Sequence, residues 1–262
     1  MNKFKNQKND LGDVIKSYGL WSYLAWHDIK IRYRRSKIGP FWLTLSMSFF
    51  CLMLGLVYSN LFKTEIKELL PFLSIGLVVW GLISGILGEM PNLFVDSSVY
   101  MKDMCINQLS ILARSISRCL IIFFHNILII IGIYIYFEIW PGWIGLLVLP
   151  GLVLVVANLA ALGLSIAILG ARFRDINQIN QNLLQLIFFV TPILWLPKLM
   201  DGNNWVLLYN PFAYYIELIR MPLLGYAPTS LSWLSSALTL IIFTAMSWIL
   251  YRLKSTRIVF WV

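Results

Sequence analysis

Long apolar segments alternate along the chain with short segments that carry the charged residues. Residues 41–62 contain no charged residue, and a helix needs about 20 apolar residues to cross a hydrocarbon core of about 30 Å. Five further segments are apolar over a similar length: 69–88, 108–137, 143–171, 178–197 and 231–251. The pattern therefore predicts an all-α polytopic membrane protein with six transmembrane helices.

Residues 198–229, before the last predicted span, are too apolar for an ordinary loop. They include the stretch LLYNPFAYYIELIRMPLLG, which Pro211 and Pro222 interrupt. We expect two short re-entrant helices that dip into the outer leaflet. An amphipathic helix lying flat in the membrane interface is the alternative.

Residues 20–37, before the first predicted span, have apolar positions on two sides of a helix. Leu20 and Ile31 share one side at 100° per residue, and Trp26 and Ile29 share another. Such a helix is suited to contact lipid with one face and protein with the other. We therefore predict an N-terminal amphipathic interface segment, although the alternation IKIRYR also suits a short strand.

The composition excludes a soluble globular protein. Hydrophobic residues make up 59% of the 262 residues and charged residues only 13%, whereas soluble domains carry about 25% charged residues. The net charge is +9, but the cations form short clusters between uncharged segments, which is typical of membrane topology and not of nucleic-acid binding. The three cysteines lack the spacing of a metal site, so neither a metal nor a disulfide framework is expected.

The basic residues predict how the chain is oriented. With both termini in the cytoplasm, 17 of the 21 Lys and Arg residues lie on the inner side, and only Lys63, Lys67, Lys198 and Arg220 lie outside. The positive-inside rule therefore favours cytoplasmic termini. Residues 1–262 then form a single transmembrane domain, divided into an interface segment (1–39), a six-span bundle (40–253) and a cytoplasmic tail (254–262).

A dense basic cluster marks the cytoplasmic edge of the first predicted span. Five of the eight residues from Lys30 to Lys37 are Lys or Arg. Each cation near an anionic leaflet contributes about 1 kcal/mol of attraction, so a topological anchor is one interpretation. The other is a phosphate site, because Arg guanidinium groups bind phosphate in bidentate fashion. The candidate phosphate ligands are Arg32, Arg34, Arg35 and Lys37.

Aromatic residues are frequent, with 11 Trp, 12 Tyr and 16 Phe. Trp42 and Phe49 are seven residues apart in the first predicted span, and Phe188 and Trp195 are seven apart in the fifth. Each pair is therefore predicted to share one helix face. Sugar C–H faces stack on aromatic rings, so these four residues are candidates for lining a glycan channel. Packing in the core or in the interfacial aromatic belt is the alternative.

Several polar residues lie inside the predicted spans, where unpaired polar groups cost free energy. We expect hydrogen bonds between helices for three of them: His125, Asn126 and Asn158. Glu89 is expected either to face a pore or to form an ion pair with Arg114 or Arg118. Outside the spans, the spacing of Glu217 and Arg220 predicts an ion pair within one helix.

Three stretches of the chain carry a resemblance to a known family: DIKIRYRRSKIGPFWLTLSM at 28–47, ARFRDINQINQNLLQLIFFVTPILW at 171–195 and NPFAYYIELIRMPLL at 210–224. In this order, on six predicted spans, they resemble the permease subunits of ABC exporters for bacterial polysaccharides, the Wzm-like O-antigen exporter family. The resemblance implies a homodimer paired with two separate ATP-binding subunits. It also implies export of a polyprenyl-diphosphate-linked glycan across the bacterial inner membrane, with capsule and teichoic acid permeases as close relatives.

The resemblance also implies where ATP acts. The chain contains no G-x-x-x-x-G-K-[ST] motif, the loop that cradles ATP phosphates, so ATP and Mg²⁺ are expected on the partner subunit and no cofactor in this chain. Family members place a coupling helix in the loop between the second and third spans, here Val99–Gln108. The candidate ATPase contacts in it are Tyr100, Lys102 and Asp103, with solvated charges as the alternative.

The fifth predicted span begins with the charged and amide-rich stretch RFRDINQINQNLLQ, residues 172–185. Arg172, Arg174 and Asp175 match the family's motif on the cytoplasmic side. A local ion pair that caps the helix is one interpretation, and a gate at the inner pore mouth is the other.

Two other functions stay open from the sequence. A small-molecule ABC efflux permease has the same broad architecture. A transferase acting on polyprenyl lipids needs clustered carboxylates or a placed base, whereas the 12 acidic residues here are scattered and only two histidines are present. The sequence therefore favours a transporter permease over an enzyme.

Overall fold

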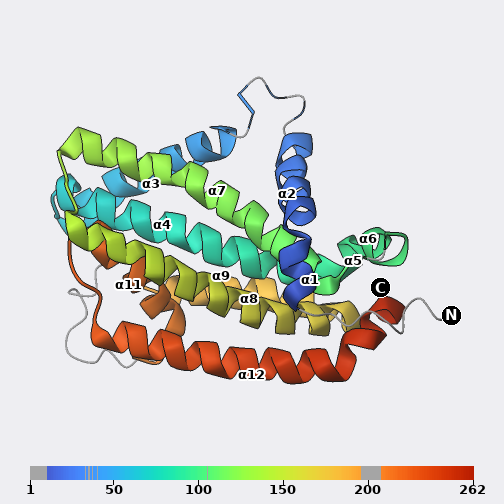
Figure 1. The fold of residues 1–262 in the computed structure, drawn as a ribbon. Helices are drawn as coiled ribbons and strands as arrows, with labels where there is room; N and C mark the ends of the chain where they lie inside the picture. Colours follow the sequence, from blue (N-terminus) through green and yellow to red (C-terminus); the bar gives the residue numbers. More distant parts are fainter. Residues whose placement is uncertain are drawn as a thin grey trace.

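The computed structural model describes residues 11–32, 34, 36, 38–39, 41–104, 106–195 and 208–262. Over these residues the secondary structure is helical and contains no strand. Five long helices run side by side (Figure 1): α3 (Phe41–Phe62), α4 (Ile66–Glu89), α7 (Gln108–Phe137), α8 (Val148–Arg172) and α12 (Ser230–Trp261). The predicted all-α fold is confirmed.

Each of these five helices is long and apolar enough to cross a membrane. α3 and α7 begin and end where the apolar pattern predicts. The Asn107 side chain caps α7 by accepting a hydrogen bond from the Leu109 amide at 2.9 Å, as short polar residues do at helix starts. Short elements extend two of the spans: η1 (Met90–Asn92) and α5 (Leu93–Asp96) follow α4, and η2 (Trp143–Leu147) leads into α8.

The fifth predicted span, residues 178–197, is a shorter helix than the apolar pattern indicates. α9 (Asp175–Val190) has 16 residues, about 24 Å at 1.5 Å per residue, and it is not among the five helices of membrane-spanning length. It ends because Thr191, with φ −88° and ψ 138°, takes the extended conformation that a following proline imposes. Helix length therefore confirms five spans and not the sixth.

α1 (Leu11–Lys16) and the end of α12 lie at the same end of the bundle, which we call the terminal end (Figure 1). α2 (Tyr18–Arg32) runs across this end, steeply inclined to the long helices. It buries Ala25 and Ile29 and packs against α7, while Trp26 and Ile31 are exposed. The strand alternative is therefore wrong for the residues up to Arg32.

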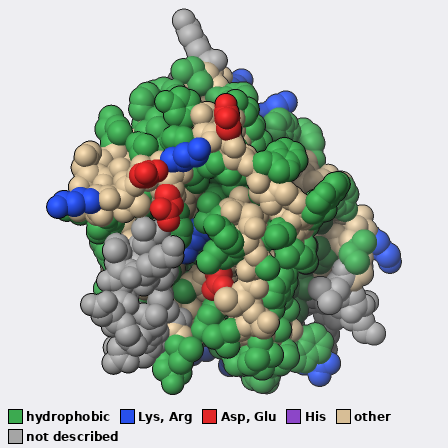
Figure 2. All heavy atoms as spheres, turned by 90° about the vertical axis from the view of Figure 1, so that its left-hand side faces the viewer, with side chains coloured by type: hydrophobic (Ala, Val, Ile, Leu, Met, Phe, Trp, Pro, Cys, Tyr) green, Lys and Arg blue, Asp and Glu red, His purple; other side chains and the backbone are tan. Residues whose placement is uncertain are grey.

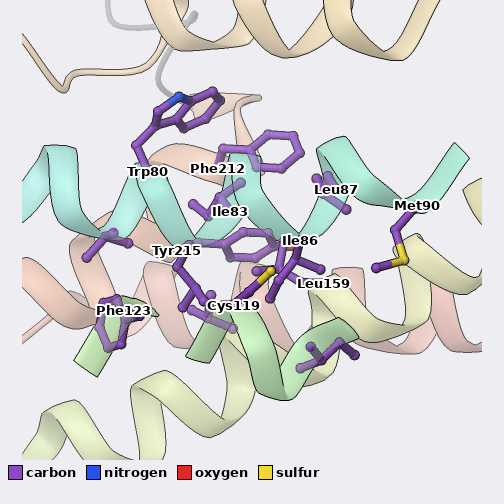
Figure 3. Close-up of a cluster of buried hydrophobic side chains, with 14 of the residues drawn as sticks. Trp80, Ile83, Ile86, Leu87, Met90, Cys119, Phe123, Leu159, Phe212 and Tyr215 are labelled. Carbon is purple, nitrogen blue, oxygen red and sulfur yellow. The ribbon is translucent and has the colours of Figure 1, made fainter. Parts of the chain in front are cut away.

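α4 lies at the centre of the bundle and packs against α3, α7, α8 and α9. Its side chains Ile83, Ile86 and Leu87 contribute to the hydrophobic core together with Leu159 of α8 and Tyr215 (Figure 3). α3 and α12, by contrast, leave most of their apolar side chains exposed. In a membrane such faces contact lipid or another protein.

α11 (Pro211–Leu223) is buried among α4, α8 and α12. Nine of its 13 residues are buried, whereas a helix lying flat in the interface would keep one long face in contact with headgroups. Its burial argues against the flat alternative. Residues 196–207 lie outside the described residues, so the expected first re-entrant helix is not tested.

Figure 2 views the end of the bundle opposite the terminal end. Hydrophobic side chains cover most of this face, and a few acidic and basic side chains are scattered over it. The turn between α3 and α4 lies here (Figure 1). The sparse charge agrees with the predicted outer side of the membrane.

Candidate functional site

An ion-pair cluster joins three helices at the terminal end. Arg114 of α7 donates two hydrogen bonds to the Asp28 carboxylate of α2, from Nε to Oδ2 at 2.9 Å and from Nη2 to Oδ1 at 2.6 Å. Arg118 bridges Asp28 at 3.0 Å and Glu89, the last residue of α4, at 2.5 Å. Ser115 donates to the same Glu89 oxygen at 2.6 Å. We call Asp28, Glu89, Arg114 and Arg118 the ion-pair cluster.

The cluster is partly buried and electrically balanced. Arg114 and Arg118 are four residues apart and share one face of α7. Their side chains are 13% and 19% exposed, and that of Asp28 is 15% exposed. The predicted pairing of Glu89 with one of these arginines is confirmed for Arg118. Asp28 is a further member that no sequence pattern indicates, since its bond to Arg114 joins residues 86 apart.

Residues 93–104, which contain the three candidate ATPase contacts of the predicted helix Val99–Gln108, are called here the coupling segment. It comprises α5 and α6 (Ser98–Lys102). The helix is shorter than the predicted Val99–Gln108, because Asn107 caps α7 and Gln108 is the first residue of α7. The expected helix in this loop is thus present, with corrected bounds.

The three candidate ATPase contacts have different surroundings. The Arg114 guanidinium lies over the Tyr100 ring, 4.4 Å from its centroid, so this ring is part of the fold. Lys102 donates a hydrogen bond to the backbone carbonyl of Val262. Asp103 is exposed. No observation here tests whether any of them contacts a partner.

A cavity of about 380 Å³ separates the coupling segment from the ion-pair cluster. Glu89, Arg114 and Arg118 line it on one side, and Asp96 and Tyr100 line it on the other. Its walls therefore carry charges of both signs. On this side α6 contacts α7 through Tyr100 and Arg114, whereas Met101 of α6 is packed in the hydrophobic core.

A groove of about 630 Å³ opens along α9. Four amides from α9 line it: Gln178, Gln181, Asn182 and Gln185. Their spacing places them on one helix face, and all four are exposed. The same face continues into Phe188 and Phe189, and Trp80 of α4 forms the facing wall. We call this the amide–aromatic groove.

Hydrogen bonds fix α9 against α4 beside this groove. The Asn180 amide donates to the Leu87 carbonyl at 3.0 Å, and the Gln181 amide donates to the Gly88 carbonyl at 3.2 Å. The sequence shows that residues 172–185 are rich in amides, but it does not indicate that four of these amides line one groove. The part played by Trp80 emerges only from the packing of α4 on α9.

The structure separates the four candidate channel residues. Phe188 lies in the amide–aromatic groove and packs on Trp80, with ring centroids 5.6 Å apart. Trp195 lies beyond α9, which ends at Val190, so the prediction that Phe188 and Trp195 share a helix face is wrong. Trp42 and Phe49 are 52% and 57% exposed on α3 and do not line the groove.

The basic cluster is only partly described. Arg32 is the last residue of α2, and Arg34 is exposed in the turn that follows. The side chain of Arg32, and Arg35 and Lys37 altogether, lie outside the described residues. The phosphate-site hypothesis is therefore not tested by geometry.

Arg172, Arg174 and Asp175 do not form the expected ion pair. The described residues hold three ion pairs, all of them in the ion-pair cluster. The Arg172 guanidinium instead lies 5.2 Å from the Phe173 ring centroid and 5.3 Å from that of Trp261. Asp175 is the first residue of α9. The helix dipole favours a carboxylate at this position even without an ion pair. Gating by these residues stays a prediction.

Three polar residues within the spans, Asn158, His125 and Asn126, differ in their hydrogen bonds. The Asn158 side chain donates to the Ser236 carbonyl of α12 at 3.0 Å and accepts from the Tyr215 hydroxyl of α11 at 2.9 Å, which confirms its expected interhelical role. His125 instead contacts the Ile121 carbonyl of its own helix at 2.7 Å. Asn126 Oδ1 is buried and makes no hydrogen bond to the described residues.

Acidic, histidine and cysteine side chains do not gather into a metal site in the described part of the chain. No group of three or more of them is placed to hold an ion there. The polar chemistry of this region is carried by the ion-pair cluster and by the amides of the groove.

Five helices of spanning length, with the described ion pairs confined to one end of the bundle, define a multi-pass membrane protein. The chain belongs to the ABC-2 type transporter family, whose model matches residues 19–224. It is therefore the membrane subunit of a transporter, and this membership implies pairing with ATP-binding subunits. The resemblance inferred from the three sequence stretches is confirmed.

Individual relatives agree with the family. The chain is 26% identical over 208 residues to the O-antigen export system permease protein RfbA of Myxococcus xanthus, with 77% of this chain and 78% of that protein covered. It is 22% identical over 222 residues to the O-antigen export system permease protein RfbA of Klebsiella pneumoniae, with 82% and 85% covered. These similarities extend over most of both chains.

Proposed function

We propose that the chain is the transmembrane subunit of an ATP-driven exporter that moves a lipid-diphosphate-linked polysaccharide, O-antigen, across the bacterial inner membrane. Two copies form the permease, and two separate subunits bind ATP and Mg²⁺. Both termini lie in the cytoplasm, and six spans per copy include α9, joined to re-entrant helices of which α11 is the second. The family membership and the names of the relatives support this proposal.

The amide–aromatic groove is the observation that carries the substrate class. Amides donate and accept hydrogen bonds with sugar hydroxyls, and aromatic rings stack on sugar C–H faces. A row of exposed amides that continues into Phe188 and Phe189 provides both kinds of contact along one helix. An apolar drug would gain little from four amides, so the groove favours a glycan over a small apolar molecule.

The path of the glycan follows from the exposed faces. The groove opens on the surface of the single chain. Trp42 and Phe49 of α3 are also exposed on the surface of the single chain. In a homodimer, these surfaces of the two copies face one another and line a channel. The diphosphate headgroup enters beside Arg32, Arg34, Arg35 and Lys37, at the predicted cytoplasmic edge of α3.

Reconstitution tests the proposal. The chain is purified together with its ATP-binding subunit and placed in proteoliposomes that contain a polyprenyl-diphosphate-linked O-antigen. We expect ATP-dependent transfer of the glycan to the opposite leaflet. If the proteoliposomes transfer only a teichoic acid or capsular glycan, or only an added drug, then that molecule and not O-antigen is the substrate. Absence of a copurifying ATPase would contradict the exporter itself.

The groove has matched variants on a single helix. Phe189→Ala and Gln185→Leu alter the groove lining, whereas Leu186→Ala removes an equally exposed side chain of α9 that does not line the groove. Loss of transition-state contacts slows a step about tenfold for each 1.4 kcal/mol. We expect Phe189→Ala and Gln185→Leu each to slow glycan transfer about tenfold at normal permease amounts. Leu186→Ala should leave the rate within a factor of about two. Equal rates in all three would contradict the role of the groove.

A further inference from the structure

Among the described residues, Arg114 contacts both α2 and the coupling segment with its side chain. On one side it makes the bidentate ion pair with Asp28 of α2. On the other, its guanidinium covers the Tyr100 ring at 4.4 Å, and Nη2 lies 3.4 Å from the Tyr100 hydroxyl as a donor. A bidentate guanidinium–carboxylate pair restrains orientation as well as distance.

α2 depends on this ion pair for its polar attachment. Asp28 is the only acidic residue of α2, and both cluster arginines donate to it. α2 also packs against α7 and buries Ala25 and Ile29. The described ion pairs that restrain the orientation of α2 are those of Asp28 with Arg114 and Arg118.

The coupling segment has room to move relative to α7. The cavity of about 380 Å³ lies between them, and Tyr100 and Arg114 meet across its edge. Met101 anchors α6 in the hydrophobic core, whereas Tyr100 borders the cavity; a displacement of Tyr100 is therefore passed on through its contact with Arg114.

We propose that Arg114 is a positioning residue that transmits movement of the coupling segment to α2, through the chain Tyr100–Arg114–Asp28. This rests on the proposed function, since an ATP-binding subunit acting at residues 93–104 supplies the movement. Each ATP-driven displacement of α6 reorients α2 and so moves the start of the basic cluster, Lys30 and Arg32 at the end of α2, relative to the membrane surface.

Hydrogen exchange on the assembled complex tests the proposal without any glycan. In the unmodified complex, a non-hydrolysable ATP analogue is expected to change exchange both in residues 93–104 and in residues 20–32. In Asp28→Asn and in Tyr100→Ala, which break the chain at opposite ends, the change in 20–32 is expected to be lost. Glu89→Gln is the matched control, because it removes a cluster charge but leaves both contacts of Arg114, and it should keep the response.

A coupled readout separates transmission from folding. Asp28→Asn is expected to lower glycan exported per ATP hydrolysed by about fivefold or more, the size of an ordinary coupling effect, with the permease amount unchanged. A response of 20–32 that persists in Asp28→Asn, or its absence in the unmodified complex, overturns the proposal. If Tyr100→Ala also abolishes the change in hydrogen exchange of residues 93–104, this variant no longer tests transmission. The result for Asp28→Asn then decides alone. Failure of any ATPase to copurify contradicts the proposed function instead.

Discussion

Arg220 of α11 donates a hydrogen bond from Nη1 to the carbonyl oxygen of Pro192 at 2.7 Å. Its guanidinium also lies 3.8 Å from the centroid of the Phe72 ring of α4, and the residue is only 3% exposed. The sequence predicts a pair with Glu217, but the Glu217 carboxylate accepts from the Thr229 amide at 3.1 Å. Arg220 therefore fastens the chain after α9 to α4 and α11, and the predicted pair is wrong.

Replacing Arg220 is expected to destabilise the protein strongly. Arg220→Gln removes the stacked cation and leaves the buried Pro192 carbonyl without its donor, which costs about 2–4 kcal/mol of unfolding free energy. Arg252 provides a matched control, because it also lies over a ring, that of Trp248 at 4.4 Å, but on the exposed surface. Arg252→Gln should change stability by less than about 0.5 kcal/mol. Thermal unfolding in detergent measures both; equal shifts would contradict the anchoring role.

Gly170 is expected to tolerate no side chain. A Cβ at this position of α8 would lie 2.2 Å from the backbone oxygen of Pro91, so η1 and α8 would have to separate. Forced overpacking of this kind costs about 1–3 kcal/mol or more. Gly170→Ala should therefore lower the unfolding midpoint and the amount of protein in the membrane. Gly132→Ala, where no atom lies within 4 Å of the added Cβ, should do neither; an unchanged midpoint in Gly170→Ala would contradict the close approach.

Asn158 is expected to hold α8, α11 and α12 together. Its Oδ1 accepts from the hydroxyls of Tyr215 and Thr239 at 2.9 and 3.0 Å, and its amide donates to Ser236. Asn158→Leu removes these bonds at a buried position and should cost about 1–2 kcal/mol. Asn60→Leu serves as the control, since Asn60 is exposed and bonds only within its own helix in the described contacts. A similar loss in both variants, measured by thermal unfolding, would argue against a special role for Asn158.

The basic cluster should be required for export and not only for orientation. Replacing Arg32, Arg34 and Arg35 together by Gln removes the guanidinium groups proposed to bind the diphosphate, and we expect export to fall about tenfold or more. The control replaces Arg252, Lys254 and Arg257, which removes the same charge at the other terminus. Surface glycan is quantified at equal permease amounts, with cysteine labelling to verify topology. Unimpaired export in the first variant would leave the cluster as an anchor.

The apolar pattern was sufficient to place most of the spanning helices. α3 and α7 match their predicted ranges because uninterrupted apolar runs and flanking polar residues determine where a helix can lie in lipid. The pattern overestimated α9, where apolar composition continues past Val190 but Pro192 removes a donor and ends the helix. It also underestimated α12, which continues through the charged residues Arg252, Lys254 and Arg257 and ends at Trp261.

By itself, the sequence determined that this is an all-α membrane protein, where its long helices run, and which family it resembles, because these follow from local composition and spacing. Only the tertiary structure decided that Asp28 meets Arg114, that Trp80 faces the amides of α9, and that Arg220 turns inward to Pro192 and away from Glu217. These contacts join residues far apart in the chain, and which partners meet depends on how the helices pack. One helix's periodicity shows which face is polar, but not which charge lies opposite it.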